Sequence, residues 1–158
     1  MTAPTLELRD LRTHFATRGG VVKAVDGVSL RVDRGQVLGL VGESGSGKSV
    51  TGFSILGLVD PPGQVVGGQV LFQGQDLARL DEEAMRHLRG NRIAMIFQDP
   101  MMTLNPVLRI DTQMIETVLA HAPVSREEAR QRARDALGQV GIAAPEERMR
   151  AYPHQFSG

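Results

Sequence analysis

The stretch GESGSGKS, residues 42–49, matches the G-x-x-x-x-G-K-[ST] pattern of a phosphate-binding loop and decides the fold class of this chain. Glycines let the backbone turn so that several N–H groups point into one concavity, which suits an anion with spread charge. Hydrophobic residues 36–41 before the loop predict a buried strand, and residues 49–58 after it predict a helix. The N-terminus of that helix would add its partial positive charge to the site. Strand, loop and helix occur in the required order, so we expect the ligand to be a nucleoside triphosphate.

Two side chains of the loop have distinct expected roles. Lys48 carries a point charge that can reach the β- and γ-phosphates, and the Ser49 hydroxyl can hold Mg²⁺. The loop residues expected to bind the nucleotide are Gly42, Glu43, Ser44, Gly45, Ser46, Gly47, Lys48 and Ser49. The sequence therefore predicts ATP with Mg²⁺ as the bound species.

The composition is that of an ordinary globular chain about one domain long. Of its 158 residues 41% are hydrophobic and 23% charged, which is enough to bury a core. Basic and acidic residues balance at 18 each and aromatic residues reach only 4%, so no nucleic-acid partner is indicated. Cys is absent, which excludes disulfides and thiolate metal sites. We see no signal peptide and no apolar run near the ~18 residues of a membrane span, so we expect membrane association only through a partner.

The residues around the loop predict a β-rich first part. Strands are predicted in three places: from Leu6 onward, where an apolar pattern begins; over residues 28–32, where apolar and polar residues alternate; and at residues 70–72, a short apolar run between glycines. Two prolines at Pro61 and Pro62 are expected to stop the loop helix. Asp81 is expected to cap a helix over residues 82–88.

The last third of the chain predicts helices. Ile115, Leu119 and Val118 suggest one apolar stripe. Ser125 with Glu128 has the pattern of a capping box at the start of a further helix. Along that helix the expected core-facing residues are Ala129, Ala133, Leu137 and Val140, with Gly141 closing it.

A second candidate site residue is Gln98. It follows residues 93–97, a continuous apolar run that predicts a strand buried on both faces. Parallel sheets present ligands at the carboxyl ends of their strands, where an amide carbonyl can bind Mg²⁺ or orient a water. Taken alone, Gln98 is more simply explained as a solvated polar residue that closes a strand.

Three motifs together resemble the nucleotide-binding subunits of ATP-binding cassette (ABC) transporters. They are the phosphate loop, the segment around Gln98 and the terminal Phe156-Ser157-Gly158, which resembles the opening of the signature motif Leu-Ser-Gly-Gly-Gln. The resemblance covers essentially the whole chain and is closest to the peptide and nickel importer branch, through residues 42–50, 96–100 with 104–106, and 152–158. It implies an α/β P-loop NTPase fold, with an antiparallel β-subdomain and P-loop core in residues 1–100 and a helical subdomain in residues 101–158.

The resemblance also implies roles for single residues. Lys48 and Gln98 would act in catalysis, Ser49 and Gln98 would hold Mg²⁺, and Val50 would adjoin the nucleotide. Phe15 would stack on the adenine, although a Phe packed in the core of the β-subdomain is the alternative. Ser157 and Gly158 would act on the nucleotide of a second subunit.

Some elements of the family have no counterpart here. The resemblance leads us to look for a strand ending in an Asp that supports Mg²⁺, a following Glu that acts on the attacking water, and a switch His, and none is found before Gly158. Two core strands would also be absent, leaving the parallel sheet incomplete. We therefore expect a truncated subunit that does not hydrolyse ATP by itself.

The implied whole protein is the ATPase subunit of an importer for oligopeptides, dipeptides or nickel. Two such subunits would pair head to tail and bind membrane-embedded permease subunits, which would place them at the cytoplasmic face of the inner membrane. Two alternatives remain at this point: a soluble ABC-type ATPase of DNA repair or chromosome maintenance, and a non-enzymatic fragment that only binds a transporter core.

Overall fold

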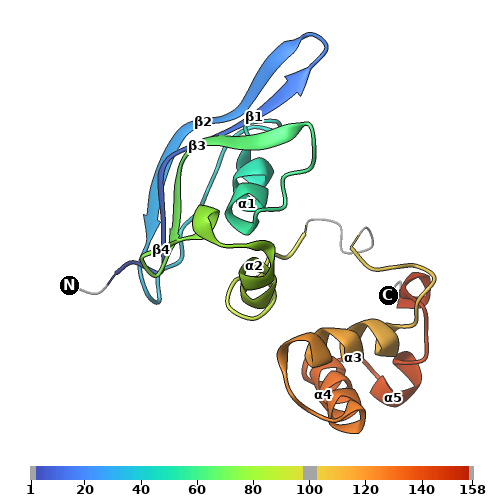
Figure 1. Cartoon of the computed structure of the whole chain (residues 1–158). Coiled ribbons are helices and arrows are strands. Elements are labelled where there is room, and N and C mark those ends of the chain that lie inside the picture. Colours follow the sequence, from blue (N-terminus) through green and yellow to red (C-terminus); the bar gives the residue numbers. More distant parts are fainter. Residues whose placement is uncertain (1–2, 98–102, 157–158) are drawn as a thin grey trace. The chain divides into compact units, whose positions relative to one another are not determined.

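The computed structural model describes residues 3–97 and 103–156, which form two compact units (Figure 1). Unit 1 is Met1–Arg89 and unit 2 is Gly90–Gly158. The expected subdomain boundary at residue 100 stays a prediction.

Unit 1 is built on a four-stranded antiparallel sheet with the order β2-β1-β3-β4. The strands are β1 (Leu6–Thr17), β2 (Gly20–Val32), β3 (Gly63–Phe72) and β4 (Gln75–Asp76). A turn at residues 18–19 joins β1 to β2, and both β2 and β3 pair with β1. The expected antiparallel β-subdomain is confirmed, and the alternating exposure over residues 28–32 follows the predicted period of two.

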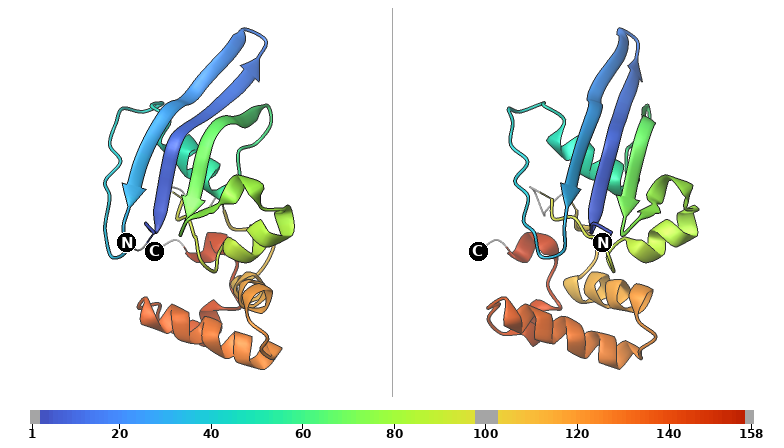
Figure 2. Two further views of the ribbon diagram at one scale, coloured as in Figure 1. Left: turned by 60° about the vertical axis from the view of Figure 1, so that its left-hand side comes forward. Right: turned by 90° about the vertical axis from the view of Figure 1, so that its left-hand side faces the viewer.

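The helix after the phosphate loop is α1 (Lys48–Leu56), which lies against one face of the sheet (Figure 2). It ends at Gly57, whose φ of +62° is left-handed, so the helix stops four residues before the prolines expected to stop it. The Gly57 N–H donates to the Ser54 carbonyl at 3.3 Å and the Leu58 N–H to the Phe53 carbonyl at 2.9 Å. These two bonds satisfy carbonyls that the helix end leaves without partners.

A second helix is the last element of unit 1. It is α2 (Glu82–Leu88), preceded by the 3-10 turn η1 (Leu77–Arg79). The Asp81 carboxylate accepts from the Ala84 N–H at 2.8 Å, as the predicted cap requires. The buried apolar side chains of unit 1 are Leu8, Leu11, Val25, Leu56, Val70, Leu71, Phe72, Leu77 and Met85.

Two predicted buried strands are wrong for this chain. Residues 36–41 and 94–97 carry no strand, and the side chains of Val37, Val41 and Ile96 are 95%, 91% and 95% exposed. A strand buried on both faces needs neighbours for its backbone hydrogen bonds and for its side chains. The sheet formed by the described residues offers these segments neither, so apolar composition alone does not make them strands.

Unit 2 is helical, as the resemblance implies. Its helices are α3 (Ile110–His121), α4 (Arg126–Gln139) and α5 (Pro145–Arg148), followed by the 3-10 turn η3 (Pro153–Phe156). Ile110, Ala133, Leu137 and Met149 form a buried cluster, and Leu104, Met114, Ile142 and Phe156 pack against it.

The ends of α4 are set by the residues that the sequence indicated. The Ser125 hydroxyl accepts from the Glu128 N–H at 3.1 Å, and the Glu128 carboxylate pairs with Arg132 at 2.6 Å. Gly141, with a φ of +79°, ends the helix in a pair of bonds typical of a Schellman motif: its own N–H to Gly138 and the Ile142 N–H to Leu137.

The predicted apolar stripes of unit 2 are only partly correct. Ala129, Ala133 and Leu137 are buried, whereas Val140, the C-cap residue of α4, is 74% exposed. On α3 Ile115 is buried, but Leu119 is 37% exposed.

Candidate phosphate-binding site

The phosphate loop runs from residue 42 to the first turn of α1, as predicted. It is tightened by a hydrogen bond from the Ser46 N–H to the Glu43 carbonyl at 3.2 Å. Helix α1 begins at Lys48, so the N–H groups of its first turn have no partners within the helix. Those groups and the helix dipole give the end of the loop a partial positive charge. Residues 42–46 and Ser49 are exposed, so the loop is open to a ligand from solvent.

The Lys48 ammonium lies within the loop. Its Nζ donates to the Gly42 carbonyl at 2.8 Å and to the Glu43 carbonyl at 2.6 Å, and lies 3.3 Å from Ser46 Oγ. These three bonds hold the positive charge inside the turn of the loop. A phosphate entering the loop would meet this charge and could replace one or more of the three oxygens as its acceptor.

Gly47 is required by the close approach of the loop to β2. Its φ of +88° lies in the left-handed region, and a Cβ on it would lie 2.1 Å from the carbonyl oxygen of Ala24. Backbone cannot move aside as a side chain can, so no larger residue fits here without displacing the loop or the strand. By contrast, a Cβ on Gly45, with a φ of +81°, would meet nothing within 4 Å.

The other end of α1 is anchored by Arg89, which follows α2. Its Nε donates to the Leu56 carbonyl at 2.7 Å and its Nη2 to the Gly57 carbonyl at 3.2 Å. Arg89 also pairs with Glu82, and the hydrogen bond and charge of Arg89 hold the pKa of Glu82 below its usual value. A cation at the C-terminal carbonyls complements the helix dipole, so Arg89 fixes the end of α1 opposite the loop.

A buried hydroxyl pair joins the middle of α1 to β1. Thr13 Oγ1 lies 2.7 Å from Ser54 Oγ, and both residues are buried. The Ser54 hydroxyl donates to the Val50 carbonyl at 2.7 Å. Since a hydroxyl has one hydrogen, Ser54 accepts from Thr13. Thr13 lies two residues from Leu11 and Phe15, so the period of the strand could have indicated its inward direction.

Phe15 lies beside α1, half-buried, and borders a small hollow of about 220 Å³. The hollow is lined by Phe15, Val50, Phe53, Leu58, Val59 and Asp60. Both Phe15 and Val50, expected to contact the nucleotide, thus line one hollow, formed by the end of β1, α1 and the segment before β3. The volume is below the ~300–1,000 Å³ of sites for whole small molecules, so it suits part of a ligand.

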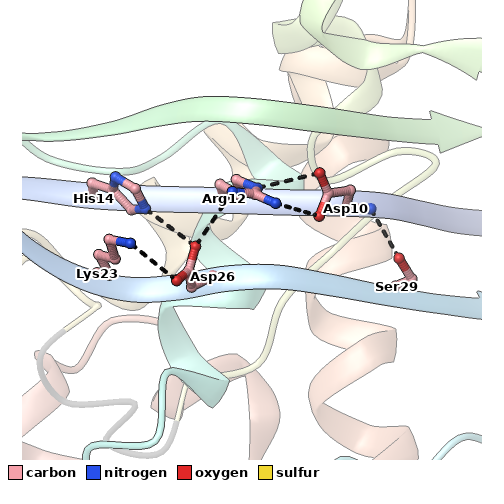
Figure 3. A network of polar contacts seen from close by, with 6 residues as sticks. All are labelled: Asp10, Arg12, His14, Lys23, Asp26 and Ser29. Carbon is pink, nitrogen blue, oxygen red and sulfur yellow. Dashed lines mark hydrogen bonds and ion pairs between the residues drawn. The ribbon is translucent and has the colours of Figure 1, made fainter.

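On the opposite face of the sheet, charged and polar side chains of β1 and β2 form a network (Figure 3). Arg12 Nη1 lies 3.8 Å and His14 Nε2 lies 3.7 Å from Asp26 Oδ1. Partial desolvation raises the pKa of Asp26, but the hydrogen bond and charge of Lys23, together with Arg12 and His14, hold it below its usual value. The labelled members are Asp10, Arg12, His14, Lys23, Asp26 and Ser29. Within residues 3–97 and 103–156 no group of three or more His, Cys, Asp or Glu could hold a metal ion.

Three predicted site residues cannot be placed. Gln98, Ser157 and Gly158 lie outside the described residues, so their roles remain predictions. The structure also brings to the site three residues that the sequence did not single out, namely Thr13, Ser54 and Gly63. Their importance arises from contacts between β1, α1 and β3, of which the local sequence pattern indicates only the inward direction of Thr13.

Comparison with known proteins identifies the family of this chain. Residues 25–158 match the family described as ABC transporter. The chain is 47% identical over 154 residues to the oligopeptide transport ATP-binding protein OppD of Bacillus subtilis, covering 97% of this chain and 43% of that protein. It is 46% identical over 153 residues to the dipeptide transport ATP-binding protein DppD of Escherichia coli, covering 97% of this chain and 47% of that protein. The chain thus spans about half the length of the curated relatives it matches.

A solved structure supports the fold. The dimeric bacterial ABC transporter cassette MJ0796 superposes with a TM-score of 0.81 at 24% identity, over 97% of this chain and 63% of that one. No helix in the described parts of the chain is both long and apolar enough to cross a membrane. The match over residues 25–158, with the phosphate loop and the cassette fold, shows that this chain belongs to the ABC transporter family.

Proposed function

We propose that this chain binds Mg²⁺·ATP at residues 42–49, as part of the ATP-binding subunit of a peptide importer. The observation that supports it most is the loop itself, in which Gly47 is held against Ala24 and the Lys48 ammonium lies inside the turn at the N-terminus of α1. The relatives named as oligopeptide and dipeptide transport proteins favour peptides as the solute.

The chain's own residues would divide the work of binding. Lys48 and the N–H groups of the first turn of α1 would bind the phosphate oxygens, and the Ser49 hydroxyl would hold Mg²⁺. Phe15 and Val50 would contact the nucleobase end in the hollow beside α1. When bound, Mg²⁺ would neutralise phosphate charge, and these residues would position the nucleotide. Gln98 would add a carbonyl ligand to the metal.

The whole subunit would act as a pair at the membrane. Two subunits would meet head to tail, with Ser157 and Gly158 of one contacting the nucleotide of the other. The pair would bind permease subunits at the cytoplasmic face of the membrane, without nucleic acid as a partner. Closure of the pair on ATP and its reopening after hydrolysis would switch the permease subunits between inward- and outward-facing states.

Calorimetric titration of the 158-residue chain with Mg²⁺·ATP tests the proposal, with Lys48→Ala as the variant. Removing the ammonium takes away a charge-assisted contact to phosphate, so heat of binding should disappear or the affinity should fall by at least about tenfold, ~1.4 kcal/mol. Lys23→Ala is the matched control, because Lys23 lies on the opposite face of the sheet and pairs with Asp26. Equal affinity of wild type and Lys48→Ala would refute the assignment of the loop.

We further expect that the 158-residue chain does not turn ATP over by itself. By resemblance, such ATPases use a carboxylate that acts on the attacking water, and the given sequence shows no match to that motif. Release of phosphate from purified chain should stay at the level of a Lys48→Ala sample. Turnover that depends on both Mg²⁺ and Lys48 would contradict this expectation.

A further inference from the structure

Phe15 reaches its place beside α1 by lying against a residue without a side chain. In the pairing of β1 with β3, Phe15 stands directly opposite Gly63. A Cβ built on Gly63 would lie 2.5 Å from Cε1 and 2.8 Å from Cζ of Phe15. It would also lie 2.7 Å from Cγ1 of Val59. All three distances are well inside van der Waals contact, so the Phe15 ring occupies the space that any side chain at residue 63 would fill.

The backbone of Gly63 does not explain why a glycine is there. Its φ lies outside the left-handed region, unlike those of Gly68 and Gly74 in the same part of the chain. An alanine could adopt this backbone conformation without strain. The need for glycine therefore comes from the contact with Phe15 and Val59.

The two side chains that meet Gly63 are also two of those that line the hollow beside α1. Phe15 and Val59 form part of its wall, with Val50 and Phe53 contributed by α1. The atoms in conflict belong to the outer parts of side chains, which move more readily than a strand does. A methyl group at residue 63 would thus displace the wall of the hollow and leave the phosphate loop, which begins at Gly42, in place.

We propose that Gly63 is a positioning residue for the nucleobase, because it lets the Phe15 ring take the place from which it can stack on the base. This inference rests on the proposed binding of ATP by this chain. The phosphates are bound by residues 42–49, and Gly63 acts only on the nucleobase end through Phe15. Replacing Gly63 should therefore weaken the binding of ligands that carry a base and leave the binding of ligands without a base unchanged.

The test compares Mg²⁺·ATP with Mg²⁺·tripolyphosphate, titrated calorimetrically into the whole 158-residue chain. Gly63→Ala should weaken ATP at least about fivefold, which is ~1 kcal/mol and the lower end of base–aromatic stacking. Its affinity for tripolyphosphate should stay within about twofold of wild type. Unchanged tripolyphosphate binding also shows that the variant is folded around the loop.

Gly67→Ala is the matched control. Gly67 lies in the same strand with φ outside the left-handed region, and the nearest atom to a Cβ there is Arg12 Cδ at 3.4 Å, an ordinary contact. It should bind both ligands as wild type does. In a Phe15→Ala background the ring is gone and only the contact with Val59 remains, so Gly63→Ala should lower ATP affinity by less than it does in wild type.

The outcomes separate the inference from the proposed function. Gly63→Ala binding ATP as tightly as wild type, or losing ATP and tripolyphosphate equally, would overturn the positioning role while leaving the phosphate site intact in wild type. An equally large effect of Gly63→Ala with and without the Phe15 ring would overturn it as well. Wild-type chain that binds neither ligand would overturn the proposed function, and the inference with it.

Discussion

Removing the Ser54 hydroxyl should destabilise unit 1 more than removing the Thr13 hydroxyl. Ser54 donates to the Val50 carbonyl and accepts from Thr13, and the Thr13 side chain is fully buried. Thr13→Val removes the donor but leaves the Ser54 hydrogen bonded to Val50. Its cost should be that of one net hydrogen bond, about 0.5–1.5 kcal/mol.

Ser54→Ala has a different consequence because it strands a buried donor. The Thr13 hydroxyl, 0% exposed, would lose its partner where water cannot replace it. An unsatisfied buried polar group costs about 1–3 kcal/mol, so this variant should be the less stable one. The double variant removes both hydroxyls and should cost less than the sum of the two single changes.

Hydrogen exchange resolved by peptide is the appropriate assay. The chain has no Trp, and its one Tyr, Tyr152, lies in unit 2, so intrinsic fluorescence does not report on unit 1. Protection of amides in β1 and α1 should fall in the order wild type, Thr13→Val, Ser54→Ala, with unit 2 unchanged. A larger loss for Thr13→Val, or additive losses in the double variant, would refute the assignment of Thr13 as donor.

The remaining predictions concern the loop and the acid stability of unit 2. Gly47→Ala should lower the stability of unit 1 by more than the ~1–2 kcal/mol cost of a left-handed non-glycine residue, because its Cβ also meets the Ala24 oxygen. Gly45→Ala has the backbone cost alone, since its Cβ meets nothing within 4 Å. Hydrogen exchange of the α1 amides compares the two variants, and equal losses of protection would refute the steric contribution of Ala24. The hydrogen bond from Arg130 lowers the pKa of Glu146 in the folded chain. The ion pair should therefore stabilise the fold above the pKa of Glu in the unfolded chain, about 4.3, and this stabilisation should be lost as pH falls through the lower pKa of folded Glu146. Glu146→Gln should therefore flatten the loss of α4 protection measured below about pH 4.3, and an unchanged pH profile would show that this pair does not contribute.

Much of the local structure could be predicted from the sequence because short-range interactions determine it. The caps at Asp81 and Ser125 and the stop at Gly141 depend on bonds within a few residues, and all three are observed. The period of two over residues 28–32 predicted a half-buried strand for the same reason. The phosphate loop followed from a pattern whose glycines and lysine lie within eight residues.

The errors occurred where the state of a segment depends on distant partners. Residues 36–41 and 93–97 are as apolar as buried strands, yet Val37 and Ile96 are 95% exposed because the sheet of the described residues does not reach them. Helix α1 ends at Gly57 and not at the prolines that the sequence indicated, because Gly57 adopts the left-handed conformation that ends the helix. Val140 continues the apolar period of α4 but is 74% exposed at the C-cap, which the period alone does not indicate.

By itself, the sequence determined the family resemblance, the phosphate loop and the order of β-rich and helical parts, since motifs and periodicity are properties of neighbouring residues. Only the tertiary structure decided that Gly47 meets Ala24, that Thr13 and Ser54 share a hydrogen bond, and that Gly63 makes room for Phe15. Each of these contacts joins residues more than 20 positions apart. These contacts form only when β1 pairs with its neighbouring strands and α1 packs on the sheet, because close packing then decides which atoms can occupy the same region.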